Sequence, residues 1–270
     1  MTFEELAPAK VNLTLHVVGQ RVDGYHLLDS LVLFAKVGDR ISYSEDSQRL
    51  ELRVFGRESG DVPTGEDNLV LQAARLAGLQ SGRFLLEKNI PRAAGIGGGS
   101  SDAAAVLRGT GKGTSLLSQS LGADVSVCLV GRAARMRGIG DEVTPVDNLP
   151  ELFAVLVNPR RPVLTEAVFK KLACKDGQPM SEAPNSNCYR DFISWLAQQR
   201  NDLQQAAIAL EPEIAAVLEK LARTNADLVR MSGSGATCFG LYPDLVAAHD
   251  ASRQIAMSRP DWWVVPTQLT

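Results

Sequence analysis

Residues 91–105 read Pro91-Arg92-Ala93-Ala94-Gly95-Ile96-Gly97-Gly98-Gly99-Ser100-Ser101-Asp102-Ala103-Ala104-Ala105, and the rest of the predicted fold is organised around them. The apolar run Phe84-Leu85-Leu86 before it reads as a short buried strand, and Ala103 to Leu107 consists of good helix formers. The glycines therefore lie where a strand turns into a helix. Glycine tolerates positive φ, and the first amides of a helix have no carbonyl partners. The stretch predicts a loop that binds phosphate, with Ser100 and Ser101 adding hydroxyls.

Two other phosphate loops are excluded by spacing. A Walker A loop needs GxxxxGK[ST], but Gly111-Lys112 is followed by Gly113 and has Val106 at the first glycine position. A dinucleotide fingerprint needs GxGxxG, but Gly95-Ile96-Gly97 leads to Ser100, and Gly233-Ser234-Gly235 leads to Cys238. A flexible linker is the plainer alternative, although linkers are seldom bounded by an apolar strand and an alanine-rich helix.

The composition limits the class of protein. A chain of 270 residues exceeds the usual size of a single core, so we expect two domains or two lobes. The net charge of −3 argues against a nucleic-acid or anionic-membrane partner. The N-terminus has neither a basic start nor an apolar run, so we expect a cytoplasmic protein. The cysteines at 128, 174, 188 and 238 form no CxxC pair, which predicts reduced and mostly buried thiols.

The first candidate strand carries polar residues on one face. Residues 9–17 alternate polar and apolar side chains, and the polar ones are Lys10, Asn12, Thr14 and His16. Composition alone favours a solvent-exposed face here. The tight-turn signal Asp23-Gly24 follows and sets Tyr25 beside His26, a pair that can bind a planar ring but is more often plain surface.

Asp124 is the candidate base. It follows Gly122-Ala123 and enters an apolar run that includes Cys128, Leu129 and Val130, which we interpret as a strand. A carboxylate at the mouth of an apolar segment is costly to bury unless it is paired.

The remaining pattern predicts ordinary elements. We expect two or three strands in residues 31–55, a helix from about 66 to 79 capped by Asp67 or Asn68, and a strand at 153–157. Further helices are predicted at 165–172, 191–199 and 213–221, a linker at 147–150, and a second glycine-rich turn within 230–241.

The motifs together resemble one family. Residues 91–105 resemble the central loop, PxxxGLGGGSSxAA, of the GHMP kinases, and PAKVN, this loop, GAD and SGSGA follow in the family's order across nearly the whole chain. The resemblance implies an α+β, two-lobed GHMP kinase fold, with an N-terminal lobe like ribosomal protein S5 domain 2 and a ferredoxin-like C-terminal lobe. It also implies an N-terminal domain at residues 1–147, with the ATP loop and catalytic aspartate, and a C-terminal domain at residues 151–270.

Two further motifs narrow the implied activity. PAKVNLTL followed by DGYH resembles the branch of this family that phosphorylates a cytidylylated methylerythritol. The resemblance implies an ATP-dependent kinase acting on the 2-hydroxyl of 4-diphosphocytidyl-2-C-methyl-D-erythritol in the non-mevalonate isoprenoid pathway. It implies ATP and Mg²⁺ as cofactors, without naming metal ligands, and a monomer or weak homodimer with no nucleic-acid or membrane partner.

The resemblance also assigns residues to roles. Lys10 and Asp124 are implied as catalytic, and Phe169 as the ring that sandwiches cytosine against Tyr25. The implied ATP-binding residues are Asn68, Lys88 and Pro91 to Ser101. The implied substrate-binding residues are Asn12, Tyr25, His26, Thr165, Phe169, Gly233 and Ser234. From the residues alone, helix capping would be a sufficient explanation for Asn68. Core packing would be a sufficient explanation for Phe169.

Two departures from the family pattern keep alternatives open. Ser126 stands where the family usually has proline, and residues 109–115 bridge a place where a helical hairpin is usual. The short bridge keeps open a catalytically impaired protein that binds nucleotide without transferring phosphate. Another GHMP kinase, acting on homoserine or mevalonate, would share the loop but lack a cytosine clamp. A dinucleotide-binding oxidoreductase is the weakest alternative, since no GxGxxG is present.

Overall fold

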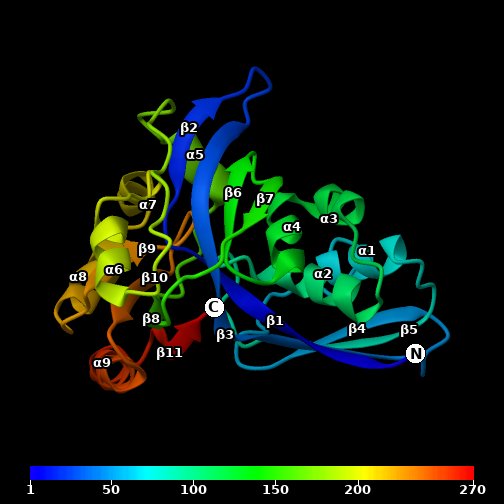
Figure 1. Ribbon diagram of the computed structural model, residues 1–270. Coiled ribbons are helices and arrows are strands. Elements are labelled where there is room, and N and C mark those ends of the chain that lie inside the picture. The colour runs from blue at the N-terminus through cyan, green and yellow to red at the C-terminus, as the bar shows by residue number, and fades with distance from the viewer. The chain divides into compact units, whose positions relative to one another are not determined.

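The computed structural model describes residues 1–270, and the chain divides into two compact units (Figure 1). Unit 1 consists of Met1–Lys10, Val37–Arg92 and Gly97–Gly131, and unit 2 of Val11–Lys36, Ala93–Ile96 and Arg132–Thr270. The units are therefore interleaved along the chain. The linear boundary expected at 147–151 falls inside unit 2 and stays a prediction about the two sequence domains.

In unit 1, helices α1 to α4 lie on one face of a small group of strands (Figure 1). Strand β5 (Gly82–Glu87) pairs antiparallel with the second half of β3 (His26–Ser44) and parallel with β4 (Leu50–Phe55), and β1 (Phe3–Asn12) also pairs with β3. The helices are α1 (Leu69–Leu76), α2 (Gly98–Gly109), α3 (Ser115–Leu121) and α4 (Ala123–Val130). Helix α2 packs against α1 and α4, so the alanine-rich helix lies in the middle of this layer.

Several predicted elements of unit 1 are confirmed. The strand before the glycines is β5, the helix after them is α2, and its residues from Ser101 to Leu107 are all buried. Asn68 caps α1, because its side chain accepts a hydrogen bond from the Val70 amide. Residues 31–55 contain two strands, β3 and β4, as expected.

The strand predicted after Asp124 is wrong, because residues 123–130 form helix α4. Glycines bound the helix at both ends, with Gly122 at φ 139° and Gly131 in the left-handed region at φ 64°. Its residues 125–128 are buried, and a short run that is apolar on every face does not reveal its period.

The departures at residues 109–126 have a local explanation. The bridge after α2 leads into the short helix α3, which begins at a Thr114 cap. The buried Ser118 of α3 and Ser126 of α4 are hydrogen-bonded through their hydroxyls at 3.0 Å. Ser126 thus joins α4 to the short helix α3.

Unit 2 is built on an antiparallel sheet in the order β3, β11 (Trp263–Leu269), β8 (Leu152–Asn158), β10 (Cys238–Tyr242) and β9 (Leu228–Met231). Strands β2 (His16–Gln20) and β6 (Ala134–Gly138) pair with the first half of β3, and β7 (Glu142–Pro145) pairs with β6. The helices are α5 (Thr165–Lys170), α6 (Tyr189–Ala197), α7 (Gln204–Leu210), α8 (Glu213–Ala222) and α9 (Leu245–Ser258). Helices α8 and α9 pack on the sheet and close a core of branched and aromatic side chains.

The cysteine prediction is half confirmed. All four thiols are free, and Cys128 and Cys238 are buried, but Cys174 and Cys188 are exposed. Burial raises the pKa of Cys128 to about 12, which keeps that thiol protonated. None of the helices combines the length and apolar character that a membrane span requires.

Candidate active site

Lys10 and Asp124 form an ion pair in unit 1. The Lys10 Nζ lies 3.0 Å from each oxygen of Asp124, although the two residues are 114 positions apart. Lys10 is 4% exposed, whereas 40% of the Asp124 side chain is open to solvent. Asp124 lies in the first turn of α4, where the helix dipole favours a negative charge. The pair therefore presents a carboxylate that Lys10 fixes on one side and that solvent reaches on the other.

The glycine stretch starts α2 without a side-chain cap. Gly97 is the cap residue in the left-handed conformation at φ 66°, and no side chain bonds to the first amides of the helix. The Ser101 hydroxyl donates 2.8 Å to the Pro8 carbonyl, so this buried serine anchors α2 on β1. The first turn therefore keeps the amide donors that suit phosphate oxygens.

The ion pair and the helix start lie together. A Cβ on Gly97 would come within 3.2 Å of Lys10 Cε, so the lysine stem runs directly under the loop. The residues predicted from three distant motifs, Lys10, Gly97 and Asp124, thus meet within unit 1.

Two residues expected to contact ATP are held by protein groups. Lys88 is 5% exposed, and its ammonium donates to the carboxylates of Asp39 and Asp102. The Asn68 amide donates 2.6 Å to the Pro63 carbonyl while its oxygen caps α1. The sequence did not indicate a role for Asp39 or Asp102. The one available signal was the position of Asp102 directly before three alanines, in a helix expected to be buried.

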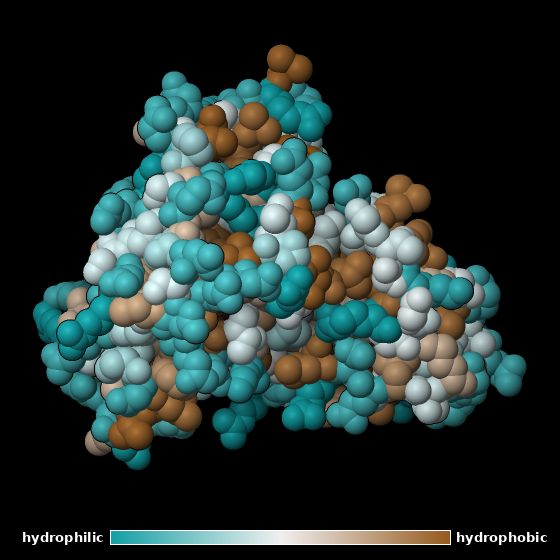
Figure 2. All heavy atoms as spheres, in the orientation of Figure 1, coloured by the Kyte–Doolittle hydropathy of each residue, from teal (hydrophilic) through white to brown (hydrophobic).

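A cavity of about 620 Å³ opens in unit 2, and four of the residues predicted to bind substrate line it. Hydrophobic residues gather on the visible surface over β2 and α5, on either side of hydrophilic ones (Figure 2). The lining residues are Gln20, Asp23, Gly24, Tyr25, His26, Leu28, Ile139, Thr165, Glu166, Phe169, Lys170 and Lys175. Sequence reasoning missed Gln20, Lys170 and Lys175, since no motif marks them.

The aromatic partner of Phe169 is His26. Their rings stack with centroids 4.7 Å apart and an interplanar angle of 25°, while Tyr25 is 61% exposed. Burial, and then the nearby Lys175, lower the pKa of His26 and favour the neutral ring. The Lys175 ammonium donates 3.2 Å to the Gln20 side-chain oxygen. The cavity thus combines a flat aromatic surface with a cation.

The other residues predicted to bind substrate lie around the second glycine turn of unit 2. The backbone N–H of Asn12 donates 3.0 Å to the Ser232 hydroxyl, and the Thr165 and Ser234 hydroxyls are 2.8 Å apart. A Cβ on Gly233 would come within 2.5 Å of the Gly95 carbonyl oxygen, so only glycine fits there. The side-chain amide of Asn201 donates to the Met231 and Gly233 carbonyls at 2.7 and 2.9 Å and holds the turn.

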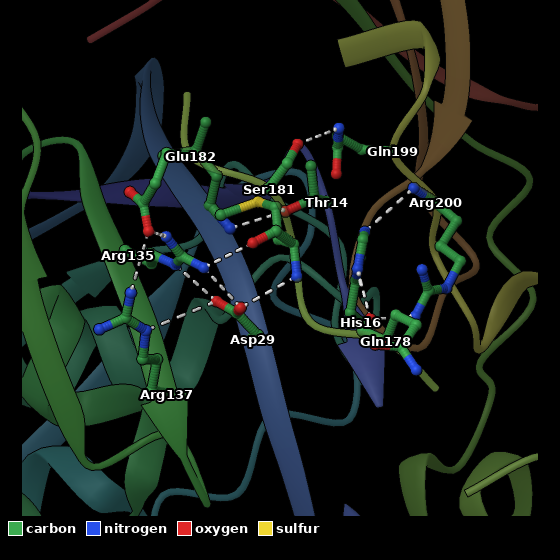
Figure 3. Close-up of polar contacts among 12 residues, drawn as sticks. Thr14, His16, Asp29, Arg135, Arg137, Gln178, Ser181, Glu182, Gln199 and Arg200 are labelled. Carbon is green, nitrogen blue, oxygen red and sulfur yellow. Dashed lines mark hydrogen bonds and ion pairs between the residues drawn. The ribbon is translucent and has the colours of Figure 1, made fainter. Parts of the chain in front are cut away.

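The prediction of a solvent-exposed polar face at residues 10–16 is wrong. Lys10, Asn12, Thr14 and His16 are at most 4% exposed. Figure 3 shows the reason for the last two, since a segment around Gln178 to Glu182 packs against them. The His16 ring contacts the Gln178 carbonyl and the Arg200 amide, each at 3.2 Å, and Thr14 bonds to the sulfur of Met180.

The same segment is anchored by a buried ion pair. Arg135 donates two hydrogen bonds of 2.7 Å to Asp29, and Asp29 also accepts the Met180 amide at 3.0 Å (Figure 3). Burial, and then Arg200, lower the pKa of His16, so the ring is neutral and uses one nitrogen as donor and one as acceptor.

Comparison with known proteins agrees with this arrangement. The family profile described as GHMP kinases N terminal domain matches residues 68–132, and that described as GHMP kinases C terminal matches residues 183–257. The 4-diphosphocytidyl-2-C-methyl-D-erythritol kinase of Roseobacter denitrificans is 50% identical over 98% of this chain and 93% of its own length. The kinase of the same name from Dinoroseobacter shibae is 52% identical over 97% of this chain and 93% of its own.

Solved structures share the fold. A crystal structure of 4-(cytidine 5'-diphospho)-2C-methyl-D-erythritol kinase superposes with a TM-score of 0.80 and 34% identity over 99% of both chains. Mevalonate kinase from L. major, in complex with R-mevalonate, covers all of this chain and 96% of its own with a TM-score of 0.72, but at 14% identity it shows the fold alone. The predicted GHMP kinase fold is thereby confirmed. Because relatives share about half of their residues with it over nearly their whole length, this chain belongs to the 4-diphosphocytidyl-2-C-methyl-D-erythritol kinase family of the GHMP kinases.

Proposed function

We propose that this chain transfers the γ-phosphoryl group of ATP to the 2-hydroxyl of 4-diphosphocytidyl-2-C-methyl-D-erythritol, as the non-mevalonate route to isoprenoid precursors requires. The observation that carries the proposal is the Lys10–Asp124 pair beside the start of α2, in a chain about half identical to kinases of that name. The partners are then ATP and this small molecule.

Asp124 is proposed as the base. An alcohol is a much weaker acid than a carboxylic acid, so the carboxylate orients the hydroxyl and takes its proton late, as the new bond to phosphorus forms. Lys10 holds the carboxylate in place and offsets negative charge that gathers between the hydroxyl and the phosphate. The 3.0 Å contact between the two side chains supports both roles.

The loop from Pro91 to Ser101 is proposed to hold the ATP phosphates through backbone amides at the start of α2. Asn68 and Lys88 are proposed to act in the same nucleotide site. Mg²⁺ usually binds through one or two carboxylates, several waters and substrate phosphates. The Asp124 side chain, which is 40% exposed, would supply one such carboxylate, and no cluster of three or more acidic, His or Cys side chains could hold a metal without the nucleotide. When bound, the ion would neutralise charge on the phosphates.

The cavity of unit 2 is proposed to take the cytidine diphosphate part of the substrate. Tyr25, His26 and Phe169 offer aromatic faces for a cytosine ring. Lys175 has no carboxylate partner among its contacts, so its ammonium complements a diphosphate. We further propose that the enzyme works in the cytoplasm as a monomer or weak homodimer.

An ATP-dependent phosphorylation assay tests the proposal. The purified chain is incubated with MgATP and either the cytidylylated methylerythritol, mevalonate or homoserine. We expect transfer to the first alcohol only, with cytidine nucleotides competing against it. Transfer to mevalonate or homoserine would point to another GHMP kinase, and ATP binding without transfer would point to an impaired homologue.

A further inference from the structure

Three buried charges meet at the base of the phosphate loop in unit 1. Lys88 follows β5, Asp39 lies in β3 and Asp102 in the first turns of α2, and they are 5%, 0% and 3% exposed. The Lys88 ammonium is 2.9 Å from Asp102 Oδ2 and also donates to Asp39 Oδ2. These contacts join a strand, the end of a second strand and a helix.

The three charges do not balance. Two carboxylates share one ammonium, and burial of charged groups is costly unless each is paired. Asp39 is well satisfied, because its other oxygen accepts the amides of Asn89 and Ile90 at 2.6 and 3.1 Å. Asp102 is not, because its Oδ1 is buried without a hydrogen-bond partner. Burial, opposed in part by Lys88, raises the pKa of Asp102 to about 7, so the charged form of this carboxylate is poorly stabilised.

The cluster lies at the two ends of the loop. Lys88 stands three residues before Pro91, and Asp102 directly follows Ser101. A Cβ on Gly98 would come within 3.5 Å of Lys88 Nζ, so the ammonium lies beneath the first residue of α2. The Lys88–Asp102 contact therefore closes residues 89–101 into a loop, and Asp39 holds the backbone where that loop begins.

We propose that Lys88, Asp39 and Asp102 form a buried staple that fixes the phosphate loop in its ATP-binding conformation. This rests on the proposed role of the loop in binding ATP. The three are positioning residues, and the Lys88 ammonium acts on the nucleotide through the loop. An Asn at position 102 keeps the shape of the side chain, accepts from Lys88 and removes the excess charge.

The test compares D102A, D102N and the control R108M with the wild type. Arg108 anchors the other end of α2, to Glu5 and to the Leu6 and Cys128 carbonyls, so R108M weakens the same helix away from the loop. We expect D102A to raise the KM for ATP about tenfold or more, because small displacements of a binding group are costly, and to leave the KM for the alcohol unchanged. We expect the KM for ATP of D102N to lie within about twofold of the wild-type value. R108M should lower the melting temperature and leave the KM for ATP unchanged.

Hydrogen exchange of peptides from residues 89–101, measured without nucleotide, gives a second readout. D102A should speed exchange there, while D102N and R108M should not. The staple is rejected if D102A leaves both the KM for ATP and this exchange unchanged, or if D102N behaves like D102A. The exchange measurement tests the staple even if the wild type transfers no phosphoryl group. Turnover by the wild type tests only the proposed function.

Discussion

At the scale of single residues, Asp124 has its chemistry set by one neighbour and one helix. The Lys10 ammonium donates a hydrogen bond of 3.0 Å to the Asp124 carboxylate. The positive end of the α4 dipole favours a negative charge at this position. We predict that Asp124→Asn lowers kcat about 10²–10⁴-fold, because an amide cannot accept the proton of the alcohol. The affinity for ATP should hardly change. Steady-state kinetics and calorimetry measure the two quantities.

The matched control for this change is Asp250→Asn. Asp250 is an exposed carboxylate on α9 that pairs only with Arg253, so its loss should leave kcat unaffected. Full turnover by the Asp124→Asn protein would exclude Asp124 as the base.

Lys175 allows a test of the cavity in unit 2. It donates to Gln20 and lies close enough to His26 to lower the pKa of that ring. We predict that Lys175→Met raises the KM for the cytidylylated alcohol roughly tenfold, since a hydrogen bond to a charged group contributes about 1.5–3 kcal/mol. Inhibition by cytidine diphosphate should weaken, and inhibition by cytidine should not.

The exposed Lys112, in the loop after α2, provides the matching charge removal as Lys112→Met. If cytidine and cytidine diphosphate lose equal affinity for the Lys175→Met protein, then Lys175 contacts the base and the diphosphate lies elsewhere.

At the scale of elements, two glycines with the same positive φ allow backbone strain to be separated from a role in catalysis. Gly97 and Gly111 flank α2, and both have φ 66°. A Cβ at Gly97 would lie 3.2 Å from Lys10 Cε, but at Gly111 it would meet nothing within 4 Å. Both alanine variants should lose about 1–2 kcal/mol of unfolding free energy, the cost of the left-handed conformation. We predict that only Gly97→Ala also lowers turnover, because it displaces Lys10.

Chemical denaturation and initial rates on the two variants decide this. An equal fall in turnover for Gly111→Ala would mean that strain in α2, and not the contact with Lys10, matters for catalysis.

Residues 123–130 show why a short buried segment cannot be assigned as helix or strand from its sequence alone, because tertiary packing selects between the two. Residues 123–130 are too few to display a period, and Val125 and Val127 fit a strand as well as a helix. Packing of α4 against α2 and the Ser118–Ser126 hydrogen bond select the helix. The cap of α1, by contrast, is predicted to within one residue, as Asp67 or Asn68, because capping is a local interaction within three residues.

At the scale of the whole molecule, buried ionisable groups make folding depend on pH. Burial, opposed in part by Lys88, raises the pKa of Asp102 from 3.8 to about 7. The folded protein thus binds this proton more tightly than the unfolded chain does. The stabilisation is complete below the unfolded pKa and is lost as the pH rises from about 4 through 7. Lys88, Asp39 and Cys128 are the ionisable groups near Asp102 in this cluster.

We therefore predict that the wild type loses unfolding free energy relative to D102N as the pH rises from 5 to 8, since Asn cannot titrate. Urea unfolding at several pH values measures the difference. His16 acts in the opposite direction, because burial lowers its pKa and its stabilisation is lost as the pH falls, but it is common to both proteins and cancels. A difference that does not vary with pH would contradict the prediction.

The features that depend on neighbours along the chain are predictable from the amino-acid order. The strand, glycine loop and helix at residues 82–109 follow from local propensity and positive-φ glycines, and the family follows from the order of the motifs. The tertiary structure alone decided the burial of the polar face at Thr14 and His16, the pairing of Lys10 with Asp124, and the Lys88 cluster. In each case the partner lies at least 14 positions away, as in Lys88 to Asp102. No local pattern encodes which distant side chain will cover or neutralise another, because burial and charge pairing are set only when the chain packs.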